Sequence, residues 1–542
     1  MDSTHSSRPS RGLAASLACL SCAAVATAQS SIFTLPGAGP GDAYGNAMAV
    51  VGDVDGDGVE DFATNAWIGL DRVEVRSGAT QALLYTLSNN ADDGFGLALA
   101  AIDDLDGDAL PDLVVAADNS VKVFSSASGV QLHTFAIAGV RHVGGGGDAT
   151  GDGVGDVLLG RNQELRVYDG ASGALVRSHP APAGACANFG TSPTFFGDAN
   201  GDGVDDYAAG APGALFCGVK TFVFAFDGAS GAPLWSNEGW YNDELGWALA
   251  AFDDVNLDGA PELLVSAKQD PGIGCGGCSG QGYVRLLDGK TGVPLWQVNG
   301  TNPYSGLGFD LAHVADVDGD GVSDFAASQP GSLFGCDTSA APVQVRSGAT
   351  GALLFQIPWG GVGFGYSLAG GDVNGDGFGD LLVGAPCEPS IALSTGFVEA
   401  FTAQEPVATY CTAKQNSQGC LPAMSWTGVP SLALSTFRAN ANQVINQKNG
   451  ILFWGRAPAA IPFLGGTLCV GGALTRTGVQ SSAGNPPPDD CSGSYSYQFT
   501  SAYMATEAIL AGESIHCQYW YRDPFSMPGS GLSDGLEFTV LP

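Results

Sequence analysis

Seven nine-residue segments of this chain place oxygen-bearing side chains at positions 1, 3, 5 and 9. The clearest segment reads Asp53-Val-Asp55-Gly-Asp57-Gly-Val-Glu-Asp61. Ca²⁺ prefers six to eight oxygen ligands, and alternate side chains of a tight loop point toward one centre. A main-chain carbonyl at position 7 adds a ligand, and glycines at positions 4 and 6 permit the turn. The pattern therefore predicts a calcium loop.

The seven segments differ in how completely they match this pattern. Thr150 stands at position 3 of the third segment, and the fifth has Leu257 at position 4 and Glu262 at position 9, so we expect the weakest sites there. We expect up to seven Ca²⁺, one per segment. For any single segment the alternative is a simple turn whose carboxylates cap main-chain N–H groups. The predicted ligands are Asp53, Asp55, Asp57 and Asp61; Asp104, Asp106, Asp108 and Asp112; Asp148, Asp152 and Asp156; Asp198, Asn200, Asp202 and Asp206; Asp254, Asn256, Asp258 and Glu262; Asp316, Asp318, Asp320 and Asp324; and Asp372, Asn374, Asp376 and Asp380.

The acidity of the chain has a local explanation in these segments. The formal net charge is −35, and 24 of the 55 Asp and Glu residues lie at the predicted ligand positions. A strongly acidic chain is not expected to bind nucleic acid, which needs a basic surface. Without metal, two carboxylates about 5 Å apart repel by roughly 3 kcal/mol at an effective dielectric near 20. We therefore expect the metal to contribute to folding.

The spacing of the segments indicates the elements that position them. Successive segments start 44 to 62 residues apart, about the length of a four-stranded propeller blade. A short apolar run such as 47–51 precedes each segment and predicts the first strand. A second run follows it, and a Gly-rich turn such as 347–351 joins the third and fourth strands. The 81 glycines suit this many tight turns.

The order of these motifs resembles the FG-GAP repeat of integrin alpha-subunit propellers and their bacterial secreted relatives. The repeat elements are a pair such as Phe364-Gly365, the aspartate segment, and Gly384-Ala-Pro386, and the resemblance covers roughly residues 30–405. It implies an all-β, seven-bladed β-propeller with calcium between the first and second strands of each blade. It also implies ligand binding on the opposite face. The third repeat departs from the pattern, because Gly139 stands where the Phe-Gly pair should be.

The last repeat lacks a fourth strand, and the beginning of the chain supplies a candidate. The segment Ser31-Ile-Phe-Thr-Leu35-Pro36 looks like the other fourth strands. We expect it to complete the seventh blade and close the ring, which removes an open sheet edge.

The first 28 residues have the features of a secretory signal. Arg8 and Arg11 precede an apolar run, and small residues allow cleavage near Ala28. We expect a secreted protein, or a periplasmic or cell-surface one, with no transmembrane segment. Lipidation of Cys19 or Cys22 is the alternative.

The cysteines of an exported chain predict disulfides. Cys275-Gly-Gly-Cys278 forms a small ring in this interpretation, with a redox or zinc role as the alternative. Cys517 is left unpaired. The expected pairs are Cys186–Cys217, Cys336–Cys387, Cys411–Cys420 and Cys469–Cys491.

Residues 406–542 differ in character from the repeats. Their turn-punctuated apolar runs predict a small β-sandwich-like domain after a propeller over 29–405. A carbohydrate-binding, anchoring or sorting role suits such a module.

No catalytic residue is predicted, because the six histidines are scattered and no nucleophile motif is present. Aromatic residues fall in the loops expected on the face opposite the metals. We expect an adhesion or recognition module for an extracellular protein or carbohydrate. An extracellular polysaccharide lyase or hydrolase is the rival hypothesis, and a quinoprotein is disfavoured. The loop aromatics are Trp67, Phe216, Trp240, Tyr241, Tyr304, Phe334 and Trp359.

Overall fold

The computed structural model describes most of the chain beyond residue 30. The described residues are 31–540 except 67–70, 90–93, 162, 183–187, 214–219, 242, 270–279, 302–305, 318–319, 331–341, 359, 388–394, 403–406, 428–429, 431, 433–434 and 511–512. Several sequence predictions fall outside this set. They concern the signal segment 1–28, the ligand Asp318, the cysteines Cys186, Cys217, Cys275, Cys278 and Cys336, and the aromatics Trp67, Phe216, Tyr304, Phe334 and Trp359.

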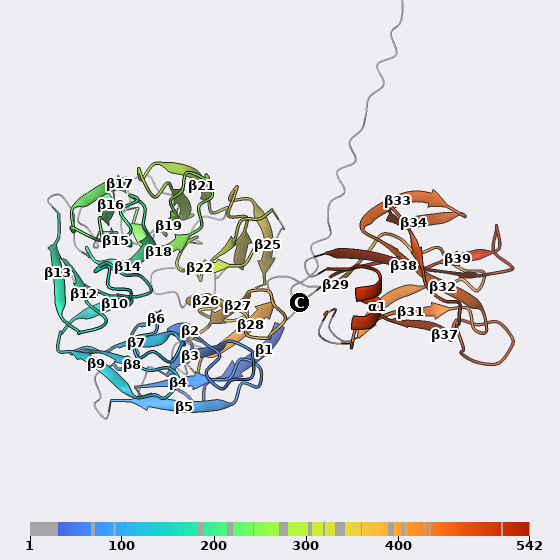
Figure 1. The fold of residues 1–542 in the computed structure, drawn as a ribbon, viewed down its shortest axis with the longest axis horizontal. Coiled ribbons are helices and arrows are strands. Elements are labelled where there is room, and N and C mark those ends of the chain that lie inside the picture. The colour runs from blue at the N-terminus through green and yellow to red at the C-terminus, as the bar shows by residue number, and fades with distance from the viewer. Residues whose placement is uncertain are drawn as a thin grey trace, which may run out of the picture.

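The first 28 strands form seven four-stranded antiparallel sheets within the described residues. These sheets lie around a common centre (Figure 1). The first strand of each sheet contacts the first strand of the next, and β26 contacts β2, so the ring is closed. The strands are β1 (Ser31–Pro36), β2 (Met48–Gly52), β3 (Asp61–Ala66), β4 (Arg72–Arg76), β5 (Leu83–Ser88), β6 (Leu99–Ile102), β7 (Asp112–Ala116), β8 (Val121–Phe124), β9 (Gln131–Phe135), β10 (Val140–Gly144), β11 (Val157–Arg161), β12 (Glu164–Tyr168), β13 (Leu175–Pro180), β14 (Thr191–Gly197), β15 (Asp206–Ala211), β16 (Lys220–Phe226), β17 (Pro233–Tyr241), β18 (Leu245–Phe252), β19 (Glu262–Ala267), β20 (Tyr283–Leu287), β21 (Pro294–Asn299), β22 (Leu311–Val314), β23 (Asp324–Ala327), β24 (Val343–Arg346), β25 (Leu353–Ile357), β26 (Ser367–Gly371), β27 (Asp380–Gly384) and β28 (Phe397–Thr402).

The ring closes through the first strand of the chain, as the sequence predicts. β1 pairs antiparallel with β28, so the last sheet has the order β1-β28-β27-β26. Phe33 of β1 also stacks on Phe62 in β3 of the first sheet, with ring centroids 5.7 Å apart. The first strand therefore joins the two ends of the ring.

The second strand of each sheet is buried on both faces. All five residues of β7 are buried, because neighbouring sheets pack against both of its sides. This explains why these strands are continuous apolar runs rather than alternating ones. The glycine of the Phe-Gly pairs is required for a steric reason, which Gly190 illustrates. Gly190 has φ +96°, and a Cβ there would lie 2.6 Å from the Glu164 carbonyl oxygen.

After β28 the sheets are of a different kind. One sheet has the order β29-β40-β38-β32-β35, with β36 paired to β32 and β39 to β38. A three-stranded sheet, β30-β31-β37, shares one core with it, so the two sheets form a sandwich. The hairpin β33–β34 is separate. The elements are β29 (Val407–Tyr410), β30 (Ala423–Thr427), β31 (Arg438–Val444), β32 (Asn449–Gly455), β33 (Ala457–Phe463), β34 (Gly466–Gly471), β35 (Thr475–Arg476), β36 (Gln480–Ser481), β37 (Gly493–Gln498), α1 (Ser501–Thr506), β38 (Ser514–Arg522), β39 (Ser530–Leu532) and β40 (Gly535–Thr539).

Across the described ranges, the chain has no helix with the length and apolar character needed to cross a membrane.

The predicted disulfides of the C-terminal region were wrong in their connectivity. Cys411 pairs with Cys469, and Cys420 pairs with Cys491, whereas the sequence analysis joined near neighbours. The reason is the strand order. β30 and β37 both flank β31 and both start beside its C-terminal end, so Cys420 and Cys491, which precede them, come together. Cys517 is a free, buried thiol, as expected.

In the propeller, Cys387 is disulfide-bonded, and Cys336, its predicted partner, lies outside the described residues. The Cys336–Cys387 pair therefore stays a prediction.

Candidate metal centres

The first aspartate loop connects β2 to β3, and its first carboxylate organises the turn. Asp53 Oδ1 accepts hydrogen bonds from the N–H groups of Gly56 at 2.8 Å and Asp57 at 3.0 Å. Its Oδ2 accepts one from Gly58 at 2.8 Å. Gly56 and Gly58 have φ of 77° and 89°, which only glycine adopts without strain. The loop is thus held by its own side chain.

All seven loops repeat this scheme. In each, the position 1 carboxylate accepts hydrogen bonds from the N–H groups of positions 5 and 6. In each, the position 9 carboxylate accepts one from position 2. A simple capped turn would use the same hydrogen bonds. The scheme alone therefore fixes the loop shape and does not distinguish metal from turn.

Position 9 has a second structural role that the sequence analysis missed. Within the described part of the ring, its other oxygen accepts a hydrogen bond in five blades from the turn between the third and fourth strands. In the first blade, Asp61 Oδ1 accepts this bond from Gly78 N–H at 2.9 Å. The equivalent donors in the other four blades are Ser126, Gly170, Gly228 and Gly348. The Gly-rich turn that recurs in the sequence between the third and fourth strands was the feature that could have predicted this role.

Burial of the position 9 carboxyls makes their ionisation costly. Burial raises the pKa of Asp112, Asp156 and Asp206 to about 6 and that of Glu262 to about 7, in spite of the hydrogen bonds they accept. Burial, with the charges of Asp376 and Asp372, raises the pKa of Asp380 to about 9. A cation in the loop would offset this cost, because an adjacent positive charge favours the carboxylate.

Among the residues that the structure describes, two loops gather three carboxylates tightly enough to share one cation. Asp53, Asp55 and Asp61 each offer an oxygen within 4.8 Å of the others. The same holds for Asp104, Asp106 and Asp108. A donor set made only of carboxylates suits a hard cation such as Ca²⁺. The residues present therefore fit the predicted ion in these two loops.

The loop of the fifth blade differs most from this arrangement. Lys290 Nζ lies 3.1 Å from Asp258 Oδ1 and also donates to the Asp258 carbonyl oxygen. The Asn256 side chain donates to Asp288 Oδ2 at 3.1 Å, so its amide is engaged outside the loop. Leu257 at position 4 has φ 58°. An ammonium group thus stands beside a carboxylate that the sequence assigned to Ca²⁺.

Side-chain substitutions at position 3 also change the donor set. In the third loop, the Thr150 hydroxyl donates to Asp148 Oδ1 at 3.1 Å. In the seventh loop, Asn374 donates through Nδ2 to Asp376 Oδ2 at 3.1 Å and to Asp380 Oδ1 at 3.0 Å. In both loops a hydrogen-bond donor faces the carboxylates. Asn374 is oriented here as a donor, whereas the sequence analysis expected its oxygen to act as a ligand.

Two of the loop aromatics predicted opposite the metal loops are described and exposed. Trp240 is 72% exposed and Tyr241 54%, both at the end of β17. This end of β17 leads from the fourth strand of one sheet to β18, the first strand of the next sheet. Connections of this kind lie on the face of the ring opposite the aspartate loops.

A buried lysine near this face was missed by the sequence analysis. Lys268 Nζ lies 3.4 Å from the ring centroid of Trp247 and 3.9 Å from Glu244 Oε1. Lys268 follows β19 at the place where the seventh repeat has Pro386 of Gly-Ala-Pro. That departure from the repeat was the available signal.

Comparison with known proteins agrees with the repeat pattern and the ring of sheets. The family model for the FG-GAP repeat matches residues 364–394. The chain contains an FG-GAP repeat. This FG-GAP repeat begins at the Phe364-Gly365 pair and includes β26 and β27.

The FG-GAP repeat protein is similar to integrin alpha chains. It is 28% identical to integrin alpha-V of Gallus gallus over 203 residues, which cover 35% of this chain and 19% of the integrin. It is 28% identical to integrin alpha-5 of Xenopus laevis over 209 residues, with the same two shares. The phosphatidylinositol-glycan-specific phospholipase D of Bos taurus is 31% identical over 175 residues, 29% of this chain and 20% of that protein. The chain thus spans about a fifth of the length of these curated relatives.

A solved structure, that of BBS1N in complex with ARL6DN, aligns with 69% of this chain and 97% of its own. Its TM-score is 0.45 at 11% sequence identity.

Proposed function

We propose that this protein is a secreted, calcium-stabilised β-propeller that acts as an adhesion or recognition module for an extracellular protein or carbohydrate. The observation that carries the proposal is the convergence of three carboxylates in each of the first two aspartate loops, in a chain similar to integrin alpha. We place the propeller at 29–405 and a second domain at 406–542, after a signal segment ending near Ala28. The disulfides Cys411–Cys469 and Cys420–Cys491 favour an oxidising compartment.

Calcium has a structural role in this proposal. In the first two loops, Asp53, Asp55 and Asp61, and Asp104, Asp106 and Asp108, would hold it. Bound Ca²⁺ supplies positive charge that relieves the repulsion among these carboxylates. The loops lie on one face of the ring, and we assign recognition to the other face, where Trp240 and Tyr241 are exposed. Exposed aromatic rings stack readily on sugars and on peptide side chains.

Removing calcium tests the structural role. When the free Ca²⁺ concentration is a hundred times the dissociation constant of a site, that site adds about 2.7 kcal/mol of stability. Several such sites should shift the melting temperature by on the order of 10 °C or more. Calorimetry of the full chain should show this drop in EDTA, and added Ca²⁺ should restore it while Mg²⁺ restores less. An unmoved transition in EDTA contradicts structural calcium.

A second candidate is an extracellular polysaccharide lyase or hydrolase on the same scaffold. The match to a phospholipase D favours an enzyme only through that protein's name, and it covers 29% of this chain. Incubation with polysaccharides and glycan-bearing phospholipids, assayed for both retention and breakdown, separates the candidates. Retention without turnover supports recognition, and turnover overturns it.

A further inference from the structure

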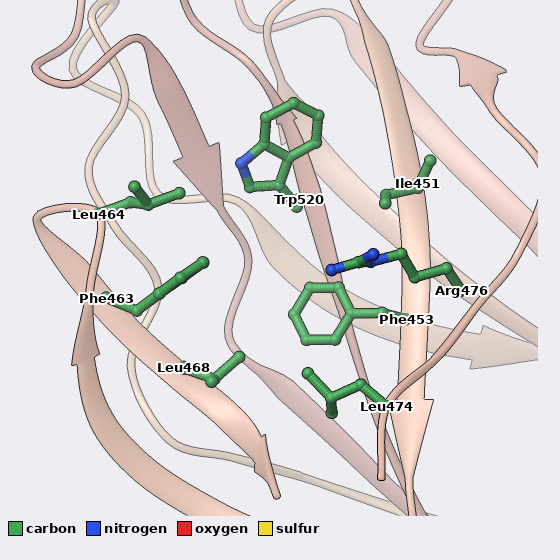
Figure 2. Close-up of a pocket in the computed structure, with 8 residues that line it drawn as sticks. All are labelled: Ile451, Phe453, Phe463, Leu464, Leu468, Leu474, Arg476 and Trp520. Carbon is green, nitrogen blue, oxygen red and sulfur yellow. The ribbon is translucent and has the colours of Figure 1, made fainter.

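An apolar cavity of about 520 Å³ lies in the C-terminal sandwich, away from the aspartate loops. Its walls come from β32, from the β33–β34 hairpin, from β38, and from β35 with the residue before it (Figure 2). The lining residues are Ile451, Phe453, Phe463, Leu464, Leu468, Leu474, Arg476 and Trp520. A cavity of this volume has the size of sites that hold small organic molecules.

The cavity exists because both faces of one sheet are apolar. Along β32, Leu452 and Trp454 point into the sandwich core, so Ile451 and Phe453 point to the other side. On β38 the core residues Tyr519 and Tyr521 flank Trp520, which is the cross-strand partner of Ile451. The outer face of a sandwich sheet is ordinarily polar. Here it carries aromatic and branched side chains that the hairpin only partly covers.

The hairpin that forms the other wall is fixed in place. The Lys414 ammonium donates to the carbonyl oxygens of Leu464, at the hairpin tip, and of Met527 and Ser530, at 2.7 to 2.9 Å. Gln518 of β38 hydrogen-bonds to Thr467 and Cys469 of β34. The disulfide from Cys469 to Cys411 adds a covalent link. The cavity is therefore preformed, which lowers the entropic cost of binding.

The only cationic side chain among the lining residues is Arg476. In Figure 2 it extends between the rings of Trp520 and Phe453, toward the wall formed by Phe463 and Leu464. Within the described residues, its guanidinium makes no ion pair and no hydrogen bond. A guanidinium presents a fork of N–H donors that matches a carboxylate. The cavity thus combines apolar walls with one free site for an anion.

The charge distribution of the chain also permits an anion here. Residues 406–542 contain six of the 20 Lys and Arg but only seven of the 55 Asp and Glu. The acidity of the protein lies almost entirely in the propeller, so the C-terminal sandwich does not repel an anion strongly.

We propose that this cavity binds a small organic carboxylate, with its apolar body between Trp520 and the hairpin and its carboxylate on Arg476. The site is separate from the aspartate loops, so it holds or fails independently of the calcium proposal.

Octanoate and 1-octanol, titrated into the full chain by calorimetry, test the proposal because they share a chain length and differ in charge. We expect octanoate to bind more tightly than octanol. Arg476→Gln should weaken octanoate severalfold, because Arg476 is exposed and its ion pair with a carboxylate is screened by solvent, and should leave octanol within about twofold. Leu474→Asp, which adds a negative charge at an exposed position of the mouth, should weaken octanoate at least as much.

Arg438→Gln is the matched control, since Arg438 is exposed on β31 in the other sheet. The melting temperature of each variant checks that it folds. The proposal is overturned by absence of octanoate binding, by equal binding of octanoate and octanol, or by an equal loss in Arg438→Gln.

Discussion

The aspartate loops of the first and fifth blades share a backbone hydrogen-bond scheme and differ in what they offer a cation. In the first loop three carboxylates converge within 4.8 Å. In the fifth, Lys290 lies 3.1 Å from Asp258 and Leu257 replaces a glycine. The scheme set by positions 1 and 9 therefore builds the loop in either case. The residues around it decide whether the loop presents free carboxylates or pairs them within the chain.

The largest expected difference between the two loops concerns position 9. Asp61 accepts three main-chain hydrogen bonds, from Val54, Asp55 and Gly78, whereas Glu262 accepts two from its own loop. Asp61→Ala leaves buried donors without a partner and should lower the free energy of unfolding by about 3 kcal/mol in EDTA. Glu262→Ala should cost about 2 kcal/mol, in proportion to its two hydrogen bonds.

Urea denaturation measures this comparison, with Asp118→Ala as an exposed carboxylate control. Equal losses at Asp61 and Glu262 would break the distinction between the two loops, because the tie from position 9 to the neighbouring turn would then have no energetic value.

A smaller effect is expected at Lys290, whose turn keeps the same main-chain hydrogen bonds as the equivalent turns and differs from them in this side chain. Five equivalent turns have alanine at this place, namely Ala79, Ala127, Ala171, Ala229 and Ala349. Lys290→Ala frees Asp258 and removes a positive charge from the loop. We expect the Ca²⁺ affinity of the fifth loop to rise for these two reasons. The rise should be only severalfold, because the lost ion pair is partly exposed and therefore screened by solvent.

Calcium titration by calorimetry measures that gain. Lys220→Ala is the matched control, since Lys220 pairs with Glu238 outside the aspartate loops. A gain of the same size in Lys220→Ala would show that overall charge, rather than the local pair, controls affinity.

The last comparison uses a carboxylate outside the loops, which separates burial from metal binding. Asp310 accepts hydrogen bonds from Leu368 and Leu311, and burial raises its pKa to about 7. The unfolded value is near 4, so the folded state holds this proton more tightly. Its contribution is therefore most favourable at low pH and declines as the pH rises from about 4 to about 7.

Asp310→Asn removes this titration. The stability difference between the wild type and Asp310→Asn, measured in EDTA by urea denaturation, should shift in favour of the variant between pH 5 and pH 8. An unchanged difference would mean that burial of a carboxyl near the ring centre has no cost, and that the position 9 pKa values need another cause.

Much of the ring could be predicted from the sequence because each repeat is local. The Phe-Gly pair, the aspartate loop and the Gly-rich turn follow one another within one sheet, and the pairing of β1 with β28 followed from a missing strand. The third-blade and fifth-blade loops were singled out from Thr150 and from Leu257 with Glu262, and their weaker calcium binding stays a prediction. The role of Lys290 was not predicted, because it lies 32 residues after Asp258 and reaches it only through the blade.

The sequence by itself determined the repeat, the all-β class and the loops that could hold calcium, since these depend on residues close together in the chain. The tertiary structure decided the contacts made between distant residues. It joined Cys411 to Cys469 rather than to Cys420 because β34 lies against the sheet that contains β29. It also placed Arg476 over an apolar cavity whose walls come from four separate segments. Such contacts depend on how the sheets pack against one another, and no local pattern of residues predicts that packing.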